Sequence, residues 1–129
     1  MFWSYDNVRV ALGSENVFDI RNKVATAFVR GENGDIHLRY HCTNVITFHP
    51  DNTFTLSSGG FRTRTTLARL REFGPLNISQ ENGKWILSSQ EGEFEFFDGI
   101  KVDPWGLVPD IDEDGFELTL DNQIRKTYL

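Results

Sequence analysis

Short stretches of the chain alternate between apolar and polar residues, the pattern typical of half-buried β-strands. Residues 36–41 alternate strictly, with three apolar side chains on one face and histidines and an arginine on the other. Asn-Gly pairs at 33–34 and 82–83 predict hairpin turns, and an Asp-Gly pair at 98–99 predicts another tight turn. The predicted strands cover residues 23–30, 36–41, 44–48, 53–57, 76–79, 84–88, 93–97, 100–102 and 116–120.

One stretch in the middle of the chain has a helical period instead. Leu67 and Leu70 lie three residues apart, which predicts a helix over about residues 65–73. Thr63 or Thr65 can cap its start. The Gly-Pro pair that follows should end it, with the glycine in the left-handed conformation.

The first 22 residues leave two interpretations open, because residues 8–12 suit a strand and residues 15–21 suit a short helix. The whole pattern predicts an α+β fold, a mostly antiparallel β-meander with one central α-helix. We expect a single domain over residues 1–129, in which residues 103–129 form an acidic C-terminal extension.

Composition agrees with one ordinary folded domain. The chain has 129 residues, of which 39% are hydrophobic and 13% aromatic. A single cysteine excludes an intrachain disulfide, and no segment resembles a signal peptide or a membrane helix. We therefore expect a cytoplasmic protein with no membrane contact and no cofactor.

The net charge of −6 argues against a globally basic nucleic-acid binder, but the charge is unevenly distributed. Residues 91–121 contain eleven acidic residues and one lysine, a net charge of −10, which leaves +4 for the rest. Residues 52–71 contain four arginines and no acidic residue. The acidic pI of about 5.0 therefore describes mainly the C-terminal part and leaves nucleic-acid contact in the middle open.

The arginine-containing middle also carries a distinctive motif, Ser-Gly-Gly-Phe-Arg-Thr-Arg-Thr-Thr at residues 58–66. With this motif, the chain resembles a family of small proteins encoded by bacteriophages and prophages, over roughly residues 22–102. The resemblance implies a viral or prophage origin and implies no particular activity. The residues that carry it are 41–48, 56–66, 69–70, Trp85 and 96–100.

This motif is the first candidate site. Two glycines allow a ligand to approach the backbone, a helix N-terminus favours an anion, and arginines suit phosphate oxygens. We expect contact with nucleic acid or another anion through the turn and helix at residues 57–71, in a non-enzymatic binding protein. The alternative is an ordinary strand-to-helix turn with capping threonines and solvated arginines. The candidate residues are Ser58, Gly59, Gly60, Arg62, Arg64, Thr65 and Arg69.

Two alternative functions come from the acidic C-terminal part. The surface of residues 91–121 could mimic DNA phosphates and bind a host protein as an inhibitor or adaptor. Asp110, Asp112, Asp114 and Asp121 follow the spacing of a calcium loop. However, an aspartate stands at the twelfth position and the flanking residues do not suggest two helices, so a solvated acidic turn is the alternative.

Other chemistry has less support in the sequence. His37 and His41 lie about 13 Å apart in a regular strand, too far for one metal ion. Cys42 falls on the apolar face of its predicted strand, which favours a buried and unreactive thiol. No serine-hydrolase, metalloprotease or dinucleotide-binding motif is present, so the sequence favours a non-enzymatic protein over the alternative of a metal-dependent enzyme that uses the histidine or aspartate clusters.

Overall fold

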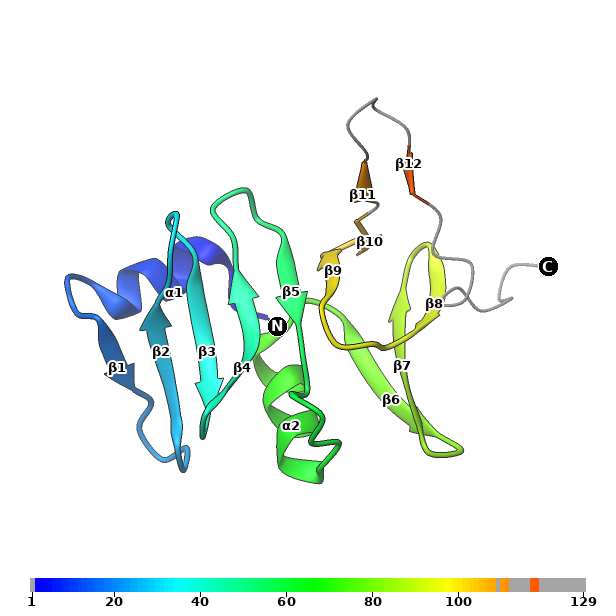
Figure 1. The fold of residues 1–129 in the computed structure, drawn as a ribbon, viewed down its shortest axis with the longest axis horizontal. Helices are drawn as coiled ribbons and strands as arrows, with labels where there is room; N and C mark the ends of the chain where they lie inside the picture. Colours follow the sequence, from blue (N-terminus) through cyan, green and yellow to red (C-terminus); the bar gives the residue numbers. More distant parts are fainter. Residues whose placement is uncertain (1, 109, 112–116, 119–129) are drawn as a thin grey trace.

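The computed structural model describes residues 2–108, 110–111 and 117–118, and these contain a large antiparallel sheet of seven strands (Figure 1). The strand order is β1-β2-β3-β4-β5-β9-β10, and every neighbouring pair is antiparallel. The α+β class and the mostly antiparallel meander are therefore confirmed. The strands are β1 (Val17–Asp19), β2 (Thr26–Arg30), β3 (Ile36–Tyr40), β4 (Thr43–Phe48), β5 (Phe54–Leu56), β9 (Ile100–Asp103) and β10 (Gly106–Leu107).

Between β5 and β9 the chain leaves this sheet. It forms helix α2 (Arg64–Phe73) and then a three-stranded antiparallel sheet, in the order β6-β7-β8, before β9 returns to pair with β5. The strands of this sheet are β6 (Asn77–Glu81), β7 (Lys84–Ser89) and β8 (Gly92–Glu95). Two further short strands, β11 (Asp110–Ile111) and β12 (Glu117–Leu118), pair with each other. Strand β12 lies within the predicted strand at 116–120, whose other residues fall outside the described ones.

Two of the predicted turns join paired strands. Asn33-Gly34 connects β2 to β3 and Asn82-Gly83 connects β6 to β7, with positive φ at all four residues. Asparagine and glycine tolerate this conformation, which explains both hairpins. Asp98-Gly99 is also a turn, but it connects strands of different sheets, because β8 pairs with β7 and β9 pairs with β5. A turn motif alone does not specify whether its two flanking strands pair.

The N-terminal segment differs from both predicted interpretations. It forms helix α1 (Tyr5–Leu12), followed by the short strand β1, so the helix and the strand occur in the opposite order to that expected. Ser4 Oγ accepts a hydrogen bond from Asn7 N, while Asn7 Oδ1 accepts one from Ser4 N. This reciprocal capping starts the helix. Burial of Val8 and Leu12, one helical turn apart, holds it against the core, so α2 is not the one helix of the fold.

Helix α2 begins one residue before its predicted start and ends at Phe73 as expected. Thr63 is the N-cap, and its side chain accepts a hydrogen bond from Thr66 N. The prediction for Gly74 was wrong, because its φ of −85° and ψ of 164° are extended rather than left-handed. A Cβ atom at this glycine would lie 2.6 Å from the Leu70 carbonyl oxygen. Lack of space, rather than backbone strain, therefore requires glycine here.

Both helices pack against one face of the large sheet. Phe28 of β2 contacts Phe48 of β4 and Phe73 of α2 edge to face, and Trp3 lies against both Phe28 and Phe73. The same hydrophobic cluster includes residues of the three-stranded sheet. The cluster residues of α2 are Leu67, Leu70 and Phe73. Those of the three-stranded sheet, together with the residue that directly follows β8, are Ile78, Trp85, Leu87, Phe94 and Phe96.

Candidate functional site

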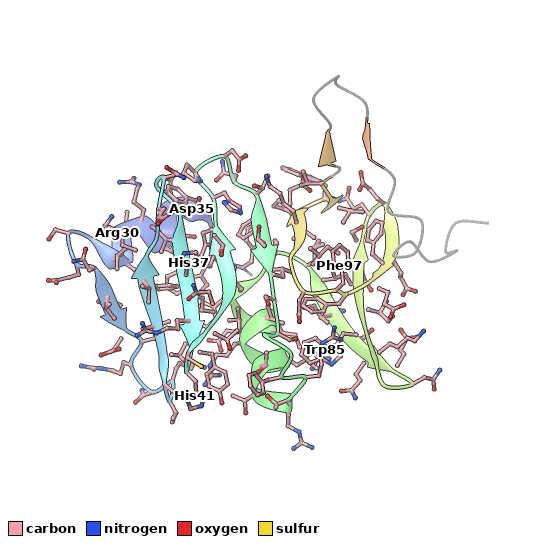
Figure 2. All side chains as sticks on the ribbon, viewed as in Figure 1. Arg30, Asp35, His37, His41, Trp85 and Phe97 are labelled. Carbon is pink, nitrogen blue, oxygen red and sulfur yellow. The ribbon has the colours of Figure 1, made fainter. Side chains whose placement is uncertain are left out.

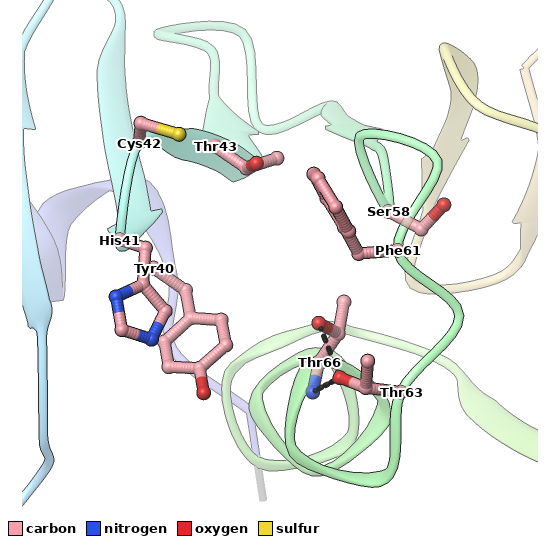
Figure 3. Close-up of a pocket in the computed structure, with 8 residues that line it drawn as sticks. All are labelled: Tyr40, His41, Cys42, Thr43, Ser58, Phe61, Thr63 and Thr66. Carbon is pink, nitrogen blue, oxygen red and sulfur yellow. Dashed lines mark hydrogen bonds between the residues drawn. The ribbon is translucent and has the colours of Figure 1, made fainter.

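A pocket of about 340 Å³ lies where the β3–β4 turn meets the N-terminal end of α2 (Figure 3). One wall comes from the end of β3, the turn and the start of β4. The other comes from the connection between β5 and α2 and the first turn of that helix. The lining residues are Tyr40, His41, Cys42, Thr43, Ser58, Phe61, Thr63 and Thr66.

Aromatic rings lie on both sides of this pocket. The Phe61 ring stands on one side, and Tyr40 and His41 stand on the other (Figure 3). Phe61 is 61% exposed, an unusually high fraction for a phenylalanine. The Tyr40 and His41 ring centroids are 4.4 Å apart, and the positive φ of His41 turns the chain sharply there. The pocket can therefore accept a flat aromatic group from solvent.

The Ser-Gly-Gly turn beside the pocket already holds an anion, the carboxylate of Asp98. Ser58 donates two hydrogen bonds to Asp98 Oδ1, from its backbone N and from Oγ, both at 2.7 Å. Gly60 N donates to Asp98 Oδ2 at 3.2 Å. Burial alone would raise the pKa of Asp98, but these hydrogen bonds and the nearby Arg62 charge outweigh it, so the pKa lies below its ordinary value.

Arg62 extends the same cluster to the second sheet. Its Nε donates to Ser58 Oγ at 3.2 Å, and its guanidinium lies 4.9 Å from the ring centroids of both Trp85 and Phe96. Figure 2 shows Trp85 beside α2, at the boundary between the two sheets. These contacts connect the β5–α2 loop to the neighbouring sheet through four residues, Ser58, Gly60, Arg62 and Asp98.

Two arginines of α2, the predicted site residue Arg69 and the nearby Arg71, also have partners within the protein. Arg69 donates from Nε to Thr26 Oγ1 at 2.9 Å and lies 5.5 Å from the Tyr40 ring centroid, so it supports a pocket wall. Arg71 donates to the Ile78 carbonyl oxygen. Arg64 is the first residue of α2 and is exposed, and the described residues provide its side chain with no hydrogen bond or ion pair.

The three remaining candidate residues have different environments. Gly59 and Gly60 are exposed with φ of 62° and 83°, and a Cβ at Gly59 would lie 2.6 Å from the Thr43 side chain. Thr65 is half-buried in the first turn of α2. The structure therefore gathers the predicted residues around one turn, but it directs several of their donors to Asp98. Sequence reasoning missed this partner, because Asp98 lies 40 residues from Ser58.

Cysteine and histidine positions differ from the sequence-based picture. The prediction for Cys42 was wrong, because this residue is exposed in the β3–β4 turn rather than buried on a strand face. A register shift between Leu38 and Arg39, and the turn at His41, separate His41 from His37. His37 instead lies on the sheet (Figure 2), where its Nδ1 is 2.8 Å from Thr47 Oγ1. Burial, the largest effect, lowers its pKa.

The described residues contain no group of three metal-ligating side chains suited to a metal ion. Of the predicted calcium ligands, Asp110 is described only as part of the β11 backbone. Asp112, Asp114 and Asp121 lie outside the described residues. Neither helix in the described part is long and apolar enough to cross a membrane.

Comparison with known proteins places the chain in a phage protein family. A family model described as Kyanoviridae Gp96 protein matches residues 5–103, more than three-quarters of the sequence. The chain belongs to the Kyanoviridae Gp96 protein family. This confirms the resemblance to phage-encoded proteins. The Gp96 match runs from the first residue of α1 to the last residue of β9, so it includes the helix missed by sequence reasoning. No curated protein and no solved structure matches the chain.

Proposed function

We propose that this Gp96 family member is a binding protein that contacts single-stranded nucleic acid at the start of α2. The observation that carries the proposal is the highly exposed Phe61 at the mouth of an aromatic-lined pocket, three positions before the exposed Arg64 in the chain. Proteins that bind single strands combine stacking platforms for bases with positive charge for the backbone. Both components are available at this position.

An unpaired base would enter the pocket and stack on Phe61, while the adjacent phosphate would contact Arg64. Stacking of one base on an aromatic ring contributes about 1–3 kcal/mol. The N-terminal end of α2 adds a favourable partial positive charge, and no acidic residue lies between positions 52 and 71. Phosphates would then bind at the helix start and not within the Ser58–Gly60 turn, whose donors hold Asp98.

A titration with fluorescent single-stranded and duplex oligonucleotides, at low and moderate salt, tests this function. We expect preference for the single strand, and about a 10-fold loss of affinity for Phe61→Ala. Arg64→Ala should weaken binding and reduce the salt slope by about one. Arg9→Ala is the matched control, because Arg9 is an exposed helical arginine of α1. Absence of binding to either strand type at low salt would exclude the proposal.

A second candidate function uses the acidic surface of residues 91–121 to bind a host protein. Trp105, in the β9–β10 turn within this segment, is 61% exposed. Exposed tryptophans are enriched at the centres of protein interfaces. Trp105→Ala and the wild type should then differ in the host proteins they retain on a column, whereas identical retained sets would argue against this surface.

A further inference from the structure

One side chain of β5 and two side chains from residues flanking β3 and β4 form a continuous hydrogen-bonded line. His49 Nδ1 lies 2.9 Å from Asp35 Oδ1, and His49 Nε2 lies 2.7 Å from Thr55 Oγ1. Asp35 directly precedes β3, His49 directly follows β4, and Thr55 is the central residue of β5. Antiparallel pairing of the three strands therefore brings the three side chains together from separate parts of the chain.

The order carboxylate, imidazole, hydroxyl is the order in which an alcohol nucleophile is activated. In the tautomer that carries its proton on Nδ1, the imidazole donates to Asp35 and leaves Nε2 free to accept a proton from Thr55. Nε2 then accepts the hydroxyl proton. Such arrangements are recognised by geometry and not by motif, which explains why the sequence motifs for hydrolases did not reveal it.

Solvent reaches this line of residues. The side chains of His49 and Asp35 are 21% and 26% exposed, and Thr55 is half-buried between the buried Phe54 and Leu56. Lys101 is the partner of Thr55 in the β5–β9 ladder, so its side chain lies on the same face of the sheet. The other ionisable groups facing His49 are His37 and Asp51.

We propose that Thr55 is a nucleophile that accepts acyl groups from activated esters, with His49 as its base and Asp35 as a positioning residue. In the first step, His49 Nε2 takes the proton of Thr55 Oγ1 as Oγ1 bonds to the ester carbonyl carbon. The tetrahedral intermediate collapses, the alcohol leaves with the electron pair of its carbon–oxygen bond, and imidazolium returns the proton to it or to solvent. Water, deprotonated by His49, then attacks the acyl-threonine. This attack breaks the bond between the acyl carbon and Thr55 Oγ1, the imidazolium returns its proton to Oγ1, and the carboxylic acid is released.

The neighbouring strand contains a matched internal control. Thr47 is the ladder partner of Thr55, and its Oγ1 is 2.8 Å from His37 Nδ1. This second pair therefore has a histidine and a threonine on the same face. In the described residues, however, His37 has no hydrogen bond to a carboxylate. If a histidine contact alone were sufficient, both threonines would react equally.

The experiment incubates the full chain with p-nitrophenyl acetate and measures acetylation of each residue by mass spectrometry, together with p-nitrophenolate release. We expect Thr55 to be acetylated at least about 100-fold faster than Thr47, because only the histidine beside Thr55 is oriented by a carboxylate. Thr55→Ser should retain the reaction, and Thr55→Val, which keeps a β-branched side chain, should abolish it. His49→Gln should slow acetylation at position 55 by about the same 100-fold.

The role of Asp35 has a separate readout. Asp35→Asn should slow acetylation of Thr55 by about 100-fold or more and leave that of Thr47 unchanged, because an amide in place of the carboxylate no longer favours the tautomer whose Nε2 accepts the hydroxyl proton. Asp35→Glu should restore part of the rate. Equal slowing at both threonines would show that Asp35 only supports the fold. Equal acetylation of Thr47 and Thr55 in the wild type, or the absence of both Thr55 acetylation and p-nitrophenolate release, overturns the proposal without reference to any variant.

Discussion

Replacement of Asp98 by alanine should destabilise the connection between the β5–α2 loop and the three-stranded sheet. The wild-type carboxylate accepts two hydrogen bonds from Ser58 and one from Gly60. Ser58 is 1% exposed, so water cannot readily replace these bonds at the serine. Arg62, which Ser58 Oγ holds against Trp85, would also lose the nearby negative charge.

The magnitude follows from these contacts. A hydrogen bond to a charged group contributes about 1.5–3 kcal/mol, and a buried unsatisfied donor costs about 1–3 kcal/mol. Solvent reaches the other side of Asp98, and the Ser58 hydroxyl can rotate toward another acceptor, so the full sum does not apply. We expect Asp98→Ala to lower the free energy of unfolding by about 2–3 kcal/mol, a fall in Tm of roughly 10 °C. Urea denaturation followed by circular dichroism measures this difference.

The stabilising effect of Asp98 should also depend on pH. The pKa of Asp98 is lowered in the folded protein, below the ordinary value of 3.8. Its charge therefore contributes stability that is fully present above pH 3.8 and is lost as the pH falls through the folded pKa. The stability difference between the wild type and Asp98→Asn should be constant near neutral pH and should shrink below about pH 4. Asp6→Ala is the control, because Asp6 is an exposed acidic residue of α1. This change should alter the free energy of unfolding by less than about 1 kcal/mol. Equal effects of the Asp98 and Asp6 variants, or a difference independent of pH, would refute the reasoning.

Three further substitutions test the supports of the pocket and of α2. Thr63→Ala removes the hydrogen bond to Thr66 N and should cost about 1 kcal/mol in urea denaturation, whereas Thr63→Ser should not. Gly74→Ala should lower the free energy of unfolding by about 1–3 kcal/mol, because the new Cβ would clash with the Leu70 carbonyl oxygen. The φ of this residue is itself allowed for alanine, so the loss would come from the clash alone. An unchanged Tm would contradict this account. Arg62→Lys keeps the charge but loses the planar group that lies against two aromatic rings. We expect this variant to lose about 1 kcal/mol of stability in thermal denaturation. Full stability of the lysine variant would show that the charge alone is sufficient.

Local patterns in the sequence determined most of the secondary structure. Strict alternation over residues 36–41, Asn-Gly turns and the spacing of Leu67 and Leu70 are encoded by adjacent residues. The phage resemblance likewise rested on a contiguous motif. The first helix was missed because its start depends on reciprocal bonds between Ser4 and Asn7, a weaker signal than the apolar run after it.

Tertiary structure decided which of these elements and side chains meet. Nothing near Ser58 in the sequence indicates that Asp98, which follows a different sheet, would occupy its donors. The β3–β4 turn likewise exposes Cys42 and brings His41 to the pocket, although alternation alone placed Cys42 on a buried face. Adjacent residues fix local periodicity through backbone geometry and side-chain burial. Contacts across 40 residues depend instead on how β5, α2 and the second sheet pack around one shared core, and only folding of the whole chain determines that arrangement.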